Sequence, residues 1–264
     1  MKEELRHIFH SGRFIGAVMI MLLCYSGYTV LDWMYCYELD VAIRPSALQE
    51  VVGCIFFGGV MLLLPLCAAL PSSISQVEEM QSAFIDLRVI RKSLKRYTAY
   101  KLSSAFLSGA VAMGLAFCLH SILWNIIATP CNTLLNDYLA IPFSEDCVYY
   151  AWQPICYSLP IYIWMMLAIS FCGGIWAIVG ITAAVYVQDK LLAIAVPFCI
   201  YYLWHSGLPN AILGFNGIPH PADLYNDALT VNTICTSLAA YAVLAIICII
   251  LYSTKLKRRH QDNA

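Results

Sequence analysis

The chain has 264 residues, of which 61% are hydrophobic and 12% are charged, and its formal net charge is −1 at pH 7. Soluble domains carry about 25% charged residues, so this chain has too few to cover a soluble fold. Its mean hydropathy of +0.73 and its long apolar runs indicate an integral membrane protein, and the near-neutral charge argues against a nucleic-acid partner.

Six apolar segments are predicted to cross the membrane, because a helix of about 20 apolar residues spans a bilayer. In chain order they are 14–31, 51–70, 102–127, 159–187, 191–204 and 231–252. The fourth is long, which predicts tilt, protrusion or a break near Gly173-Gly174, and the fifth is short. The expected fold is all-α, with six transmembrane helices in one domain over residues 1–264.

Three shorter segments complete this expected domain. Residues 1–13 carry an apolar stripe and basic residues, which predicts an interfacial helix. Residues 253–264 are expected to form a cytoplasmic tail. The segment 206–221, SGLPNAILGFNGIPHP, is apolar but interrupted by Gly and Pro. Irregular backbone at membrane depth must be packed in protein, so a re-entrant segment and a plain extracellular loop both remain open.

The basic residues indicate the orientation of the chain. All Lys and Arg except Arg44 lie on the side that carries residues 1–13, 71–101, 188–190 and the tail after Tyr252. The positive-inside rule therefore places both termini in the cytoplasm. Four cysteines lie outside the predicted spans on the outer side, and the sequence leaves open whether they form disulfides. They are Cys36, Cys131, Cys147 and Cys156.

The predicted spans contain almost no ionisable residues. No Asp, Glu, Lys or Arg lies within their apolar cores as bounded above, and His120 and His205 are the nearest candidates. The sequence has no HExxH, GxSxG or Walker A motif. An ion-coupled carrier and an intramembrane enzyme both lack their usual residues. We therefore expect no catalytic residue, no cofactor-binding residue and no metal site in this chain.

The segment 71–101 is predicted to be a cytoplasmic amphipathic helix. Pro71 is expected to end the second span, and Ser75 and Glu78 have the S-x-x-E spacing of a capping box. Apolar residues then recur at helical spacing, at Val77, Met80, Phe84, Leu87, Ile90, Leu94 and Tyr97. The basic second half suits anionic headgroups, whereas the acidic first half suits a protein partner.

This segment resembles the region between spans two and three of bacterial type-2 ABC transporter permeases, the six-span membrane subunits of peptide, bacteriocin-immunity and multidrug exporters. The family pattern is Leu-Pro, then a Glu, a small residue, and Arg-x-Ser-x-x-x-Tyr-x-x-x-Lys. The matching positions are Leu70, Pro71, Glu79, Ala83, Arg91, Ser93, Tyr97 and Lys101. Many family members have Gly where this chain has Ala83.

The resemblance implies a permease in the bacterial cytoplasmic membrane that dimerises with a second permease copy and binds a separate ATPase, which holds the ATP and Mg. It implies export of a hydrophobic or amphipathic peptide, lipid or drug. By resemblance, docking to the ATPase belongs to the coupling helix around Glu78, Glu79, Ala83 and Phe84. By the same resemblance, the anchor of the loop at the membrane surface comprises Arg91, Ser93, Tyr97 and Lys101.

Two other classes of protein share this topology. A membrane scaffold or sensor subunit would need no ATPase partner. The substrate-binding membrane subunit of a vitamin-type transporter also has six spans, but it usually couples through small-residue motifs within a helix and lacks such a charged loop. The sequence leaves the substrate, the direction of transport and the choice between homodimer and heterodimer open.

Overall fold

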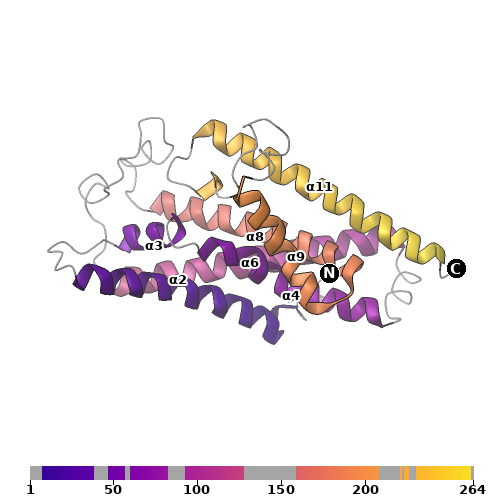
Figure 1. Ribbon diagram of the computed structural model, residues 1–264, viewed down its shortest axis with the longest axis horizontal. Coiled ribbons are helices and arrows are strands. Elements are labelled where there is room, and N and C mark those ends of the chain that lie inside the picture. The colour runs from indigo at the N-terminus through magenta and orange to yellow at the C-terminus, as the bar shows by residue number, and fades with distance from the viewer. Residues whose placement is uncertain are drawn as a thin grey trace.

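All the secondary structure in the described part of the chain is helical, which confirms the all-α class (Figure 1). The computed structural model describes residues 8–38, 47–56, 60–82, 93–127, 159–207, 221, 223–225 and 230–262. The helices are α2 (Gly12–Glu38), α3 (Ala47–Phe56), η1 (Val60–Leu63), α4 (Leu64–Gln81), α6 (Leu94–Ile127), α8 (Leu159–Val187), α9 (Lys190–His205), η3 (Asp223–Tyr225) and α11 (Val231–Asp262).

Five helical segments of the described chain are long and apolar enough to cross a membrane, where the sequence analysis predicted six. They are Gly12–Met34, Val60–Gln81, Leu94–Ile127, Leu159–Val187 and Val231–Gln261. The predicted fifth span is α9, whose 16 residues extend only about 24 Å, less than the ~30 Å hydrocarbon core. The predicted second span is divided between α3 and the η1–α4 segment.

The prediction that Pro71 ends a span is wrong, because α4 continues through Pro71 to Gln81. Proline removes one backbone hydrogen bond, and helices that pack around it in a membrane protein can absorb this loss. Pro71 is buried, as are Ser72 and Ser73 beside it. The capping-box prediction is wrong for the same reason, since Ser75 and Glu78 lie inside α4 and not at the start of a new helix.

The centre of the bundle is α8, which is apolar on all sides and packs against α4, α6, α9 and α11. It is continuous over Leu159–Val187, so the predicted break at Gly173-Gly174 does not occur. These glycines allow close packing instead. A Cβ added at Gly109 of α6 would lie 2.5 Å from the carbonyl oxygen of Gly173, so the two backbones are nearly in contact.

The turn between α8 and α9 reverses the chain within two residues. Gln188 has a positive φ of 55°, and the carboxylate of Asp189 accepts hydrogen bonds from the backbone amides of Leu191 and Leu192, both at 2.9 Å. This is an N-cap, which satisfies amides that would otherwise lack a partner. The short α9 consequently starts at the same end of the bundle at which α8 stops.

The predictions for the terminal segments and for residues 206–221 are tested only where the structure describes those residues. Residues 253–262 continue α11 without interruption to Asp262, so the predicted tail is helical for nearly all of its length. Of the interfacial helix predicted at 1–13, residues 1–7 lie outside the described part of the chain. Most of 206–221 also lies outside it, as do Cys131, Cys147 and Cys156 and the side chain of Cys36.

Candidate functional site

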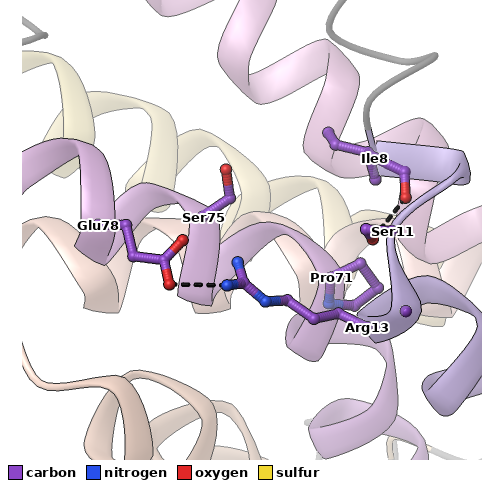
Figure 2. A pocket seen from close by; sticks show the side chains of 7 residues that line it. Ile8, Ser11, Arg13, Pro71, Ser75 and Glu78 are labelled. Carbon is purple, nitrogen blue, oxygen red and sulfur yellow. Dashed lines mark hydrogen bonds and ion pairs between the residues drawn. The ribbon is translucent and has the colours of Figure 1, made fainter.

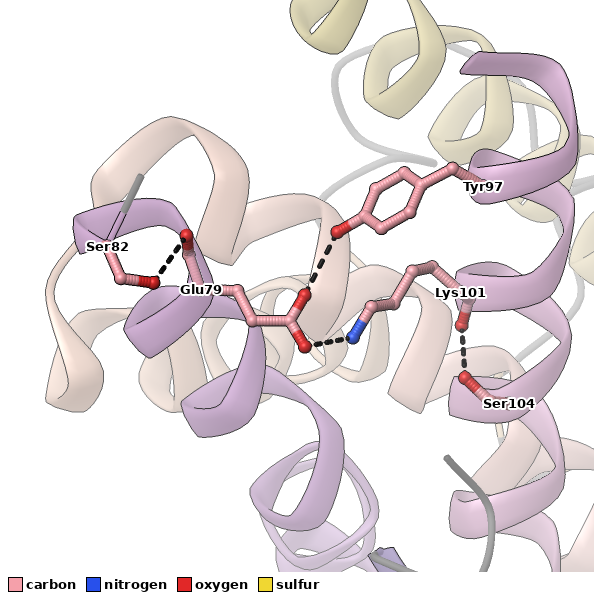
Figure 3. Close-up of polar contacts among 5 residues, drawn as sticks. All are labelled: Glu79, Ser82, Tyr97, Lys101 and Ser104. Atoms are coloured by element: carbon pink, nitrogen blue, oxygen red, sulfur yellow. Dashed lines mark hydrogen bonds and ion pairs between the residues drawn. The ribbon is translucent and has the colours of Figure 1, made fainter. Parts of the chain in front are cut away.

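The last turn of α4 carries a buried ion pair to the first turns of α6. Lys101 Nζ donates to Glu79 Oε1 at 2.6 Å, and the Tyr97 hydroxyl donates to Glu79 Oε2 at 3.0 Å (Figure 3). The Lys101 side chain is 5% exposed and that of Glu79 is 15% exposed. Tyr97 and Lys101 are one helical turn apart on α6, which is why both reach the same carboxylate.

Glu78, the neighbouring residue on α4, forms ion pairs with α2 and α9 and not with α6. Its Oε1 accepts from Arg13 Nη2 of α2 at 2.7 Å and from Lys190 Nζ of α9 at 2.8 Å. Figure 2 shows Arg13 reaching across a polar pocket, beside Ser11 and Pro71, to Glu78. These side chains are 37–49% exposed, so water and salt weaken both pairs.

A third contact joins α11 to the same turn of α4. Arg259 Nη2 donates to the backbone carbonyl oxygen of Met80 at 3.0 Å. Gln81 Nε2 likewise donates to the carbonyl oxygen of Gln188, in the α8–α9 turn, at 2.9 Å. The residues Glu78 to Gln81, which we term the α4 hub, therefore contact α2, α6, α9, α11 and the α8–α9 turn.

The basic residues that the structure describes all lie at this end of the bundle, which we term the charged end (Figure 1). It comprises the start of α2, the end of α4, the start of α6, the α8–α9 turn and the end of α11. The Lys and Arg in question are Arg13, Lys95, Arg96, Lys101, Lys190, Lys255, Lys257, Arg258 and Arg259.

The structure brings together four of the eight residues singled out from the sequence. Glu78 and Glu79 lie in the last turn of α4, and Tyr97 and Lys101 contact Glu79 from α6. The fifth, Ser93, immediately precedes α6, where its carbonyl oxygen accepts from the amide of Tyr97 at 3.1 Å. The other three lie outside the described residues, namely Ala83, Phe84 and Arg91.

A second group of polar residues, at the opposite end of the bundle, was missed from the sequence. Glu50 on α3 is 2% exposed, and neither carboxylate oxygen has a hydrogen-bond partner. Asp32 lies within the first span and not beyond its end. The sequence prediction bounded the first two spans at residues 31 and 51, so both acids fell just outside them. The signal in the sequence that could have indicated their burial was an acidic residue directly next to an apolar run.

Helix α3, which carries Glu50, packs against α2. Cys54, one turn after Glu50, donates from Sγ to the carbonyl oxygen of Tyr25 at 3.7 Å. Since α3 follows α2 in the chain and packs against it, Glu50 lies near the part of α2 that carries Thr29 and Asp32. Burial, and after it the carboxylate of Asp32, raise the pKa of Glu50 to about 8.

Helix α6 covers the same stretch of α2. Its His120 ring lies 5.3 Å from the Tyr25 ring, and its Trp124 ring lies 5.5 Å from the Trp33 ring. Three α6 side chains here have a buried polar atom without a hydrogen-bond partner: His120 Nε2, Ser121 Oγ and Trp124 Nε1. Because buried polar groups are nearly always paired, such a concentration is unusual.

Within the described residues, no group of three or more His, Cys, Asp or Glu side chains is arranged to hold a metal ion. The cysteines whose side chains the structure describes form no disulfide, namely Cys24, Cys54, Cys67, Cys118, Cys172, Cys199, Cys235 and Cys248. Comparison with protein-family models, with curated protein sequences and with solved structures finds no match to this chain.

Proposed function

We propose that this chain is the membrane permease subunit of an ATP-driven ABC exporter, which moves a hydrophobic or amphipathic compound out of the cell. The observation that carries the proposal is the α4 hub. The hub contains Glu78 and Glu79 and lies just before Ala83 and Phe84, the residues around which the family resemblance implies ATPase docking. It is bonded to α2, α6, α9 and α11. A force on that loop therefore reaches most of the bundle through one helical turn.

The two kinds of ion pair suit a moving part. The buried Glu79–Lys101 pair, supported by Tyr97, holds α4 and α6 together, because separating it would leave charges in a low-dielectric interior. The exposed pairs from Glu78 to Arg13 and Lys190 contribute about 0–1 kcal/mol each. They can break and re-form as the loop moves. We infer that α4 and α6 move as a unit, while α2 and α9 shift against them.

The same proposal fixes location and partners. By the positive-inside rule, the charged end and both termini face the cytoplasm. The chain lies in the bacterial cytoplasmic membrane. ATP and Mg bind to a separate ATPase subunit, and a second permease copy completes the transporter. A scaffold or sensor subunit without an ATPase is the competing function, which the following experiment distinguishes.

Docking is tested by purifying the chain together with each candidate ATPase from the same cell. We expect one ATPase to co-purify with the wild-type chain, and we expect Phe84→Asp to abolish this, because a charge replaces the apolar side chain in the docking segment. Lys95→Ala, an exposed residue nearby on α6, is the matched control and should retain the ATPase. Co-purification that survives Phe84→Asp, or no co-purification with any ATPase, contradicts the proposal.

Glu79 is unsuitable for this test, although the resemblance assigns it to docking. Its carboxylate is bonded to Tyr97 and Lys101 inside the protein, so replacing it changes the fold as well as any ATPase contact. Glu78 is a better second variant, because its ion pairs are exposed and their loss costs little.

A further inference from the structure

An apolar groove of about 480 Å³ lies between the last turns of α6 and the first turns of α8, at the end of the bundle opposite to the charged end. Phe117, Ile122, Ile163 and Met166 are among the side chains that line it. Both helices are long and apolar enough to span a membrane, and Ile122 and Ile163 are 52% and 46% exposed. Exposed apolar side chains on a membrane span contact lipid chains, so the groove opens to the bilayer.

The dimensions of the groove suit one alkyl chain in one leaflet. It follows α6 from Phe117 to Ile126. At 1.5 Å per residue this stretch is about 14 Å long, close to half of the ~30 Å hydrocarbon core. Its volume lies in the lower half of the range of about 300–1,000 Å³ that is usual for ligand pockets. A single chain that enters from the outer boundary therefore fills the groove.

The outer end of the groove is polar and uncharged. Asn125, in the last turn of α6, donates from Nδ2 to the hydroxyl oxygen of Tyr162, in the first turn of α8, at 3.1 Å. It also donates to the backbone carbonyl oxygen of Ser121 at 2.8 Å. These bonds use the amide N–H groups of Asn125 and not its side-chain oxygen. The polar end lies where both helices approach the headgroup region, so it can meet the polar part of an amphiphile.

Ser121 provides a second polar contact one helical turn deeper in the groove. It lines the groove and is only 9% exposed, and its Oγ has no hydrogen-bond partner in the described part of the chain. A buried hydroxyl without a partner costs free energy, and buried polar groups are nearly always paired. In the wall of an otherwise apolar groove, this hydroxyl indicates that a bound molecule supplies the partner.

The lining of the groove selects an uncharged ligand. None of the described residues that line it carries a charge, and the described Lys and Arg all lie at the charged end. A charged group bound here would lose its hydration without gaining an ion pair. An ester carbonyl can instead accept a hydrogen bond from Ser121 Oγ, and a hydroxyl group can donate to Asn125 Oδ1. These two contacts are about 6 Å apart along α6.

We propose that the α6–α8 groove binds an uncharged single-chain amphiphile of the monoacylglycerol type. Its chain lies along Phe117, Ile122 and Ile163, and its ester carbonyl accepts from Ser121. Its glycerol hydroxyl groups lie at Asn125 and Tyr162. The site goes beyond the proposed function, because binding needs neither ATP nor an ATPase, and a failure of one proposal leaves the other standing.

The test uses the full chain in phosphatidylcholine nanodiscs with a photoreactive monoacylglycerol that carries a diazirine in its acyl chain. Labelling is measured against the mole fraction of the probe, and mass spectrometry locates the labelled residues. We expect saturable labelling that is concentrated on Ile122 and Ile163. Because phosphatidylcholine is in large excess, saturation means preference over a two-chain zwitterionic lipid. Labelling that rises linearly and spreads evenly over the apolar surfaces of the spans overturns the proposal.

Ile163→Trp tests the groove itself, because the larger side chain fills it. We expect at least a tenfold loss of labelling at Ile122. Ile250→Trp makes the same change at a position on α11 that is 56% exposed and does not line the groove. This control should be labelled as the wild type is. Labelling that survives Ile163→Trp, or that falls equally in both variants, contradicts the proposal.

Ser121→Ala tests the polar contact. The half-saturating mole fraction should rise about fivefold, whereas the unloaded protein should be at least as stable as the wild type, because an unpaired hydroxyl is removed. Ser253→Ala on α11, whose hydroxyl donates to the carbonyl oxygen of Ile249 at 2.6 Å, is the control and should leave the affinity unchanged. Equal affinity in the wild type and Ser121→Ala overturns the contact.

Competition separates binding of the whole amphiphile from binding of its chain. Unlabelled monooleoylglycerol should compete with the probe. Octadecene, which has a chain and no polar group, should compete at least tenfold less well. Equal competition by the two compounds would show that the chain alone is bound, and it would overturn the proposal.

Discussion

Lys101→Met is expected to destabilise the protein by about 3–5 kcal/mol. The substitution removes the 2.6 Å ion pair from the Glu79 carboxylate, whose side chain is 15% exposed (Figure 3). Removing one partner of a largely buried ion pair is costly, whereas methionine preserves most of the packing of the lysine chain. Reversible unfolding in mixed micelles measures the change.

The control for this prediction is Lys190→Met, which removes a lysine of the same length from the neighbouring glutamate. The Lys190 side chain is 49% exposed, so its loss should cost no more than about 1 kcal/mol. The double variant Lys101→Met with Glu79→Gln should recover much of the stability, because no charge is left buried. If Lys101→Met and Lys190→Met cost the same, the buried pair does not hold α4 to α6.

Gly109→Leu is expected to cost about 3 kcal/mol or more, at the upper end of what overpacking costs. Even a Cβ at this position would lie 2.5 Å from the Gly173 carbonyl oxygen and 2.6 Å from the Cβ of Ala177. A leucine can be accommodated only if α6 and α8 move apart. Since α8 packs against α4, α9 and α11 as well as α6, the displacement would disturb the centre of the bundle.

Gly16→Leu on α2 is the matched control, because a Cβ there meets no atom within 4 Å. Leucine also favours a helix over glycine by about 0.5–1 kcal/mol, so this variant should be as stable as the wild type or slightly more stable. Unfolding of both variants under one set of conditions gives the comparison. Equal stabilities would contradict the close α6–α8 contact.

Much of the bundle could be predicted from hydrophobicity alone. The predicted span 159–187 matches α8 residue for residue, and 102–127 lies within α6. Long apolar runs determine such helices with little ambiguity. The boundaries near Pro71 were wrong because proline and the S-x-x-E spacing are local signals. Packing of neighbouring helices around α4 outweighs both signals, and it cannot be read from those residues.

The candidate sites were only partly accessible to sequence reasoning. The resemblance pointed to Glu79, Tyr97 and Lys101, but it did not predict that they contact one another. Glu79 and Lys101 are 22 positions apart. The segment between them was expected to bind headgroups and an ATPase. Glu50 was overlooked because a charge at the edge of an apolar run looks like a loop residue. Helix α3, which carries Glu50, packs against α2 and α6. No local sequence pattern predicts this packing or the burial of Glu50.

ATP hydrolysis by a reconstituted complex tests the central claim most directly. The chain is placed in nanodiscs with the ATPase subunit that co-purifies with it, and the hydrolysis rate is compared with that of the ATPase alone. We predict that the wild-type complex hydrolyses ATP at a rate clearly different from that of the free ATPase. With Phe84→Asp, the rate should equal that of the free ATPase. A hydrolysis rate that is the same with and without this chain would contradict it.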